Sequence, residues 1–151
     1  MPLETTMLPF TNQTIEIAQI IQLSVAPVFL LTGLGTILTV LTNRLARLVD
    51  RARKLEEHVD EDAAAQSELA AKLGLMARRA RLINRAITLC TISALLVALV
   101  VVTLFLNTIV SFDLAAIIAT LFILAMLALI TALLLFLREV FLAVGSLRIG
   151  S

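Results

Sequence analysis

Three long stretches without a charged residue divide the chain, and they cover residues 20–42, 86–110 and 114–137. At a helical rise of about 1.5 Å per residue, the shortest of them spans roughly 35 Å, which exceeds a hydrocarbon core of about 30 Å. The pattern therefore predicts three transmembrane helices. The connection between the second and third stretches is so short that these two helices should be antiparallel neighbours.

The polar segment between the first two stretches carries a heptad pattern in each half. Its apolar residues recur at alternating steps of four and three, at Leu41, Leu45, Leu48, Ala52, Leu55 and Val59, and again at Leu69, Leu73, Met76, Ala80, Ile83 and Ile87. The two sets mirror each other about position 64, as antiparallel helices require, with residue 41 opposite residue 87. We predict an all-α fold in which the first two transmembrane helices extend into an antiparallel coiled-coil hairpin over residues 43–85.

Both connections between helices contain residues suited to capping a helix. In the hairpin, the turn is expected within residues 59–67, where Asp60, Asp62 and Ser67 compete as the N-cap. In the connection before the third stretch, Asp113 is positioned to accept hydrogen bonds from the first backbone N–H groups of the helix.

The basic residues all lie on one side of this layout. Ten of the twelve Lys and Arg residues fall between positions 44 and 85, and the other two follow the third stretch, at Arg138 and Arg148. Because Lys and Arg accumulate on the cytoplasmic side of a membrane, we expect the hairpin and the tail 138–151 inside the cell. Residues 1–19, which include the start of the first helix, are expected outside the cytoplasm.

Composition supports a membrane protein and argues against an enzyme. Hydrophobic residues make up 60% of the chain and the mean hydropathy is +1.05, whereas the net charge is only +1. No Cys/His ligand spacing, Gly-rich phosphate loop or nucleophile beside a base occurs. The single histidine, His58, precedes an acidic turn, which we favour over a metal site. We expect no catalytic, cofactor-binding or metal-binding residue.

Two arginine stripes begin where the membrane helices end. One consists of Arg44, Arg47, Arg51 and Lys54, and the other of Arg78, Arg81 and Arg85. Both extend about 10 to 15 Å from the membrane, the depth of anionic lipid head groups. The favoured interpretation is a topology anchor that contacts lipid phosphates, and the alternative is a dedicated site for an anionic lipid. Nucleic acid is not an expected partner, because the stripes lack interleaved aromatic residues.

Charged residues of all three helices should meet at the cytoplasmic boundary. Arg44, Arg85, Arg138 and Glu139 all fall at this depth, and Glu139 is the only acid among them. An unpaired carboxylate at the hydrocarbon edge is costly, so Glu139 should accept hydrogen bonds from Arg44 or Arg85. We predict a structural clamp there, with a gate or ion-sensing role as the alternative.

A stripe of small and polar residues follows the first transmembrane helix. It contains Gln22, Thr32, Gly35, Thr36, Thr39 and Asn43. Such residues usually serve close helix packing, with hydroxyls bonded to their own backbone. The alternative is a water-filled path in an oligomer. Since three helices enclose little polar surface, we expect a homo-oligomer or a subunit of a larger membrane complex.

Four motifs resemble one particular family. They are APVFLL (26–31), NRLARLVDRAR (43–53), RRARLINRAI (78–87) and FLREV (136–140), and together they look like a family of small bacterial multi-pass membrane proteins of unknown function. The resemblance extends from Ile20 to Val144. It implies a bacterial plasma (inner) membrane and no assigned activity, and it brings no catalytic residue.

The leading functional hypothesis is a non-enzymatic, oligomeric scaffold or accessory subunit whose hairpin presents a binding surface. The first alternative is a small homo-oligomeric channel lined by the first transmembrane helix, and the second is an anionic-lipid sensor. The polar stripe discriminates between scaffold and channel, since it faces protein in a scaffold and water in a channel.

Overall fold

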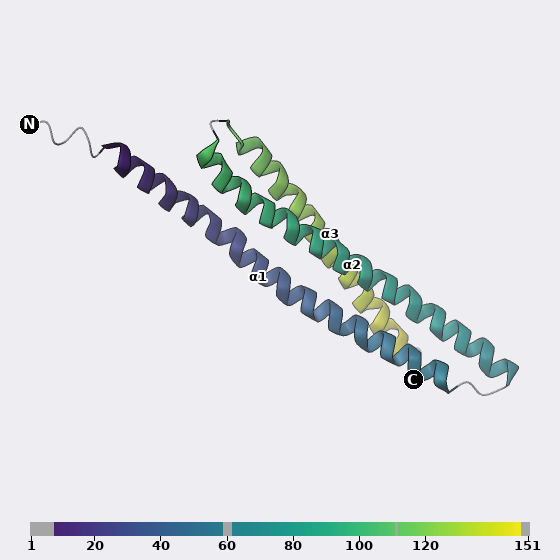
Figure 1. Cartoon of the computed structure of the whole chain (residues 1–151). Helices are drawn as coiled ribbons and strands as arrows, with labels where there is room; N and C mark the ends of the chain where they lie inside the picture. Colours follow the sequence, from purple (N-terminus) through teal and green to yellow (C-terminus); the bar gives the residue numbers. More distant parts are fainter. Residues whose placement is uncertain (1–7, 59–61, 111, 149–151) are drawn as a thin grey trace, which may run out of the picture.

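The protein consists of three long helices in an antiparallel arrangement (Figure 1). The computed structural model describes residues 8–58, 62–110 and 112–148, and these residues form no β-strand. The helices are α1 (Leu8–Glu57), α2 (Ala63–Ile109) and α3 (Ala115–Arg148). The predicted all-α class is therefore confirmed. Residues 138–148, predicted as a tail, continue α3.

All three helices are long and apolar enough to cross a membrane, as expected of a multi-pass membrane protein. The 50 residues of α1 and the 47 residues of α2 correspond to about 75 Å and 70 Å of helix. Both helices are thus more than twice as long as a hydrocarbon core of about 30 Å. Each carries its apolar stretch into the charged segment without a break.

The central helix, α2, packs against both of the others. Its buried side chains alternate at steps of three and four residues, at Ile83, Ala86, Cys90, Ser93, Val97 and Val100. Buried residues of the flanking helices recur every seven residues, at Leu34, Leu41 and Leu48 in α1 and at Ala125, Ala132 and Glu139 in α3. The heptad pattern predicted for the polar segment therefore continues through the apolar spans.

The pairing of α1 with α2 differs from the predicted register by about one helical turn. The Sγ atom of Cys90 donates to the backbone carbonyl of Leu34 over 4.0 Å. The predicted mirror would instead place residue 94 opposite Leu34. Alternating steps of four and three look alike after such a shift, so the apolar pattern alone is compatible with both registers. The contact between Cys90 and Leu34 is the observation that favours the shifted register.

Capping residues differ between the two connections. Asp62 is the N-cap residue of α2 but makes no capping side-chain hydrogen bond, Ser67 lies within α2, and Asp60 lies outside the described residues. At the other connection the Oδ1 atom of Asp113 accepts the N–H of Ala115 at 3.0 Å, as predicted. The Oδ1 atom of Asn107 also accepts the N–H of Leu114 at 3.1 Å, which the sequence did not suggest.

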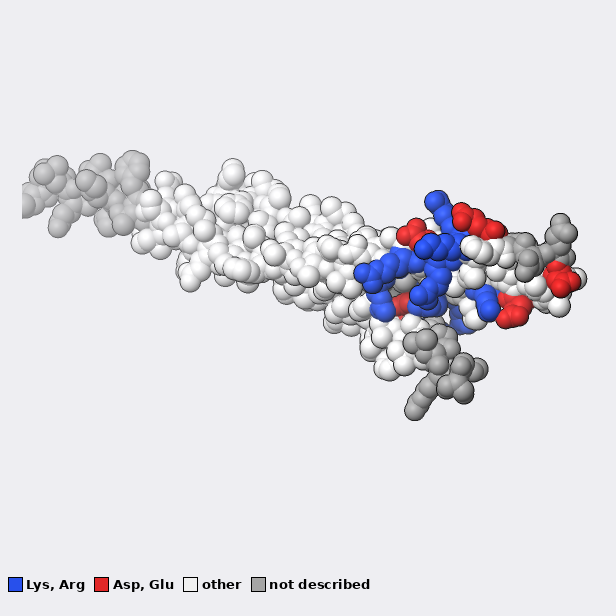
Figure 2. Space-filling view, turned by 90° about the horizontal axis from the view of Figure 1, so that it is seen from below, with Lys and Arg blue, Asp and Glu red and all other residues white. Residues whose placement is uncertain are grey.

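Basic side chains gather at one end of this elongated molecule (Figure 2). They lie over the segments where α1 and α2 approach their connection and where α3 ends, whereas the visible surface of the long remainder is almost free of Lys and Arg. The structure therefore has a charged end and an apolar body, and the junction between these two parts is where all three helices contribute charged groups.

Candidate functional site

A single buried carboxylate marks the junction of the three helices. Glu139 is 0% exposed and continues the heptad series of Ala125 and Ala132 along α3. In the apolar part of the bundle, the hydroxyl of Ser93 donates to the carbonyl of Ala125 at 2.8 Å. This hydrogen bond fixes the position of α3 along the axis of α2. Two heptads further toward the charged end, the same face of α3 brings Glu139 to Arg79 of α2.

Two arginines from different helices bind this carboxylate. Arg79 donates from Nη2 to Oε1 at 2.9 Å and from Nε to the same oxygen at 3.3 Å. Arg44 of α1 places Nη1 3.1 Å from Oε2, and its guanidinium lies over the ring of Phe136, 5.3 Å from the centroid. Glu139 therefore connects α1, α2 and α3 at a single point.

The prediction that Arg44 lies beside Glu139 is correct, but the arginine of α2 that pairs with Glu139 is Arg79 and not the predicted Arg85. Arg85 is exposed and forms no ion pair with Glu139 in the described part of the chain. Arg79 takes its place because the buried stripe of α2, followed back from Ala86 through Ile83, reaches Arg79 at the next step of four. Helical periodicity was thus the signal that could have identified Arg79. Arg138 is exposed beside Glu139.

A hollow of about 220 Å³ opens next to the buried carboxylate. Residues of all three helices line it, namely Arg44, Arg47, Leu48 and Arg51 of α1, Arg79 and Ile83 of α2, and Glu139 of α3. Four arginines and one carboxylate therefore line the same hollow. This basic hollow includes Arg44, Arg47 and Arg51 of the first predicted stripe but not Lys54.

The second predicted stripe is not held in one place. Arg78 lines a neighbouring hollow of about 230 Å³, together with Arg51, Lys72, Leu75, Met76, Arg79 and Leu142. Leu75 is 62% exposed there, on a segment that is otherwise rich in charge. Arg81 and Arg85 are exposed and line neither hollow. The two stripes are therefore not equivalent in the folded molecule.

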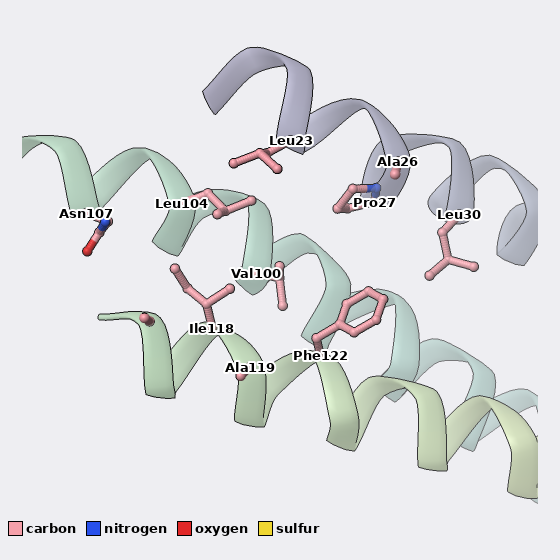
Figure 3. Close-up of a pocket in the computed structure, with 11 residues that line it drawn as sticks. Leu23, Ala26, Pro27, Leu30, Val100, Leu104, Asn107, Ile118, Ala119 and Phe122 are labelled. Carbon is pink, nitrogen blue, oxygen red and sulfur yellow. The ribbon is translucent and has the colours of Figure 1, made fainter. Parts of the chain in front are cut away.

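At the opposite end, an apolar cleft of about 600 Å³ separates α1 from α2 and α3 (Figure 3). Leu23, Pro27 and Leu30 face it from α1, Val100 and Leu104 from α2, and Ile118, Ala119 and Phe122 from α3. Its most polar side chain is that of Asn107, and no charged residue lines it. The cleft offers apolar surface and no group for chemistry.

The predicted polar stripe of α1 faces away from α2 and α3. Gln22, Thr32, Gly35, Thr36, Thr39 and Asn43 are all exposed. The three threonine hydroxyls donate to carbonyls of their own helix, as expected, at 3.4, 3.2 and 2.9 Å. A Cβ atom built on Gly35 would meet nothing within 4 Å. The close packing expected for this stripe is therefore not made within one chain.

Metal-ligating groups do not cluster in the described part of the chain, where no set of three His, Cys, Asp or Glu residues could hold an ion. The Nδ1 atom of His58 lies 2.8 Å from the carbonyl of Lys54, one turn earlier in α1. Two of its acidic neighbours, Asp60 and Glu61, lie outside the described residues. Cys90 is buried and free.

Residues 24–149 match a family model described as "Protein of unknown function (DUF2721)". This chain belongs to the DUF2721 family. The DUF2721 match includes the whole junction around Glu139, and it confirms the family of unknown function that the four motifs suggested. No curated protein matches the chain, and no solved structure matches it.

Proposed function

We propose that this DUF2721 protein is a non-enzymatic, oligomeric membrane scaffold that presents a helical hairpin to a partner in the cytoplasm. One observation carries the proposal. Beyond the apolar spans, α1 and α2 continue as a charged antiparallel pair, and Glu139 joins the end of α3 to its base through Arg44 and Arg79. A pair held in this way has a defined direction relative to the membrane, as a presenting arm needs.

The orientation follows from the distribution of charge. Positive residues favour the cytoplasmic side, so the charged end faces the cytoplasm of a bacterial cell and α1 begins outside it. The heptad spacing of buried residues favours coiled-coil packing of the arm. A reporter enzyme that works only in the cytoplasm is expected to be active when it is fused after residue 151, and a reporter that works only outside the cytoplasm is expected to be inactive. Activity confined to the opposite side would contradict this orientation.

The hollow around Leu75 is the surface that best suits a protein partner. Leu75, Met76 and Leu142 supply apolar contact area, and Lys72 and Arg78 flank them with positive charge. An exposed apolar side chain ringed by cations is complementary to an amphipathic segment that carries carboxylates. The proposed partner is therefore an acidic protein segment.

Photo-crosslinking in living cells tests this surface. A benzoylphenylalanine residue at position 75 should form a discrete protein adduct, and the same residue at the exposed position Ala77, outside the hollow, should not. Adding Lys72→Gln to the first variant should weaken the adduct, because one of the flanking charges is lost. Equal labelling from positions 75 and 77, or no effect of Lys72→Gln, would refute the assignment of the hollow.

Assembly into an oligomer is proposed to use the exposed polar stripe of α1. Small residues allow helices to approach closely within a membrane, and among the described residues no other helix covers this stripe. Thr32→Cys should form a disulfide-linked dimer in native membranes under mild oxidation. Ile92→Cys, exposed at the same level on α2, is the matched control, and the parent chain with its buried Cys90 is the blank. Equal cross-linking of both variants would contradict assembly through α1.

The exposure of the same stripe also favours a second candidate, a homo-oligomeric channel lined by α1. Thr36→Phe distinguishes the two functions. In a scaffold the bulky side chain should prevent assembly, as measured by the mass of the detergent-solubilised particle. In a channel it should leave the oligomer intact and change ion flux into liposomes.

A further inference from the structure

We infer that the basic hollow at the helix junction binds a phosphate group, and that an anionic membrane lipid supplies it. The inference concerns the site formed by Arg44, Arg47, Arg51, Arg79 and Glu139, and it holds whether the protein acts as a scaffold or as a channel. It replaces the two equivalent arginine stripes of the sequence prediction with one site built by three helices.

The charge balance of the hollow calls for an anion. Four arginines line it together with a single glutamate, which leaves three positive charges without compensation among the lining residues. Guanidinium groups held close together repel one another, and the repulsion is strongest where solvent is partly excluded. The side chain of Arg79 is only 24% exposed and that of Arg44 36% exposed. A bound phosphate would relieve this repulsion.

The hydrogen-bond donors of the hollow are also largely unused. Arg79 directs two N–H groups to Oε1 of Glu139. Oε2 lies 3.1 Å from Nη1 of Arg44 but accepts no hydrogen bond, so the approach of Arg44 is one of charge and leaves its donors available. Each guanidinium carries five donors in a planar fork that matches the oxygens of a phosphate. Glu139 thus orients two of the four arginines and occupies few of their donors.

The position of the hollow favours a lipid as the source of the phosphate. Arg44 follows the apolar span of α1 by two residues, and the apolar side chains of Leu48 and Ile83 form part of the lining. Lipid phosphates lie at this depth, and basic pockets between membrane helices suit anionic head groups. The volume of about 220 Å³ corresponds to several water molecules at about 30 Å³ each, enough for a phosphate group with some hydration.

Native mass spectrometry of the full-length protein in detergent tests the site. Dioleoylphosphatidylglycerol is added as the anionic probe, dioleoylphosphatidylcholine as the zwitterionic probe, and inorganic phosphate as a free competitor. The test variant is Arg47→Gln/Arg51→Gln, which removes two charges from the hollow without touching the ion pairs of Glu139. The matched control, Arg81→Gln/Arg85→Gln, removes two exposed charges from α2 that line neither hollow.

Selective retention of phosphatidylglycerol by the parent chain is expected, with about tenfold lower affinity in the test variant than in the control, because two charged donors to the phosphate are lost. Circular dichroism should show unchanged helix content in both variants. Equal weakening in the two variants would mean diffuse surface attraction and would overturn the site, as would equal retention of phosphatidylcholine or no retention. Displacement by inorganic phosphate at the concentration of the lipid would overturn the lipid as the source.

Discussion

The two ends of the helical bundle are held together in opposite ways. At the end away from the basic residues an apolar cleft of about 600 Å³ separates α1 from its neighbours, whereas at the charged end Glu139 and two arginines join all three helices. Lipid chains are as apolar as leucine, so apolar helix faces gain little by closing onto each other within a membrane. Lipid chains cannot replace the partners of a buried carboxylate, which must therefore stay paired with cations of the protein. The polar contacts therefore hold the three helices together at the charged end, and no comparable contact among the described residues closes the cleft.

The largest expected effect is the loss of the junction around Glu139. Glu139→Gln should destabilise the fold by about 3 kcal/mol, because Arg44 and Arg79 keep their charges without a counter-ion. This value is near the lower limit for breaking a buried ion pair, since both arginine side chains are partly exposed to solvent. Unfolding in detergent, followed by circular dichroism, measures the loss. Exchanging the charges of Arg79 and Glu139 should restore part of the stability, and a swap without any recovery would argue against the clamp.

Replacing alanine by leucine compares the packing of the apolar cleft with the packing of the middle of the bundle. Ala125 is 0% exposed and packs against α2, so Ala125→Leu should cost about 2 kcal/mol through overpacking. Ala119 is exposed and lines the apolar cleft, where the same enlargement has space and should change stability by less than about 0.5 kcal/mol. The same denaturation assay compares the two variants, and an equal loss would disprove an open cleft.

A smaller effect is expected from the N-terminal cap of α3, at the end of the bundle that contains the apolar cleft. The carboxylate of Asp113 accepts the N–H of Ala115, and Asp113→Ala should cost about 1 kcal/mol. Asp62, at the start of α2, makes no capping side-chain hydrogen bond, so Asp62→Ala serves as a control with little expected change. Thermal unfolding of both variants checks this. A larger loss from Asp62→Ala would reverse the assignment of the two caps.

The smallest effect concerns an ion pair on the exposed surface of the charged end. The hydrogen bond from Lys72 at 2.9 Å, together with the charge of Lys72, holds the pKa of Glu68 below its usual value of 4.5. The contribution to stability is therefore complete above that pH and is lost as the pH falls through the lower, folded-state pKa. The melting temperatures of the parent chain and Glu68→Gln should differ slightly at pH 7 and converge in acid. A difference that grows in acid would contradict the sign.

Much of the fold could be predicted because the length of an uncharged stretch and the spacing of apolar residues along a helix can both be read from neighbouring positions in the sequence. The uncharged stretches gave the three helices, and the heptad spacing of Leu41 and Leu48 identified the face of α1 that is buried. The pairing level between α1 and α2 could not be derived in this way. A repeated apolar pattern is nearly unchanged by a shift of one turn, whereas the contact between Cys90 and Leu34 distinguishes the two registers.

The candidate site was predicted only in part for a related reason. Depth in the membrane correctly selected Glu139 and Arg44, because burial of a carboxylate near hydrocarbon demands a cation at the same level. Depth alone could not distinguish Arg85 from Arg79, which are less than two turns apart on the same helix. Arg79, unlike Arg85, continues the buried face of α2 that carries Ile83 and Ala86, and this face meets Glu139.

The sequence alone determined which segments are apolar, where the basic residues collect and which carboxylate must be neutralised, because each of these depends on neighbours within a few helical turns. Only the tertiary structure decided the register of the helices, the open cleft at one end and the gathering of Arg44, Arg47, Arg51 and Arg79 into one hollow. These features depend on how three long helices are rotated and shifted against one another, which no single helix encodes by itself.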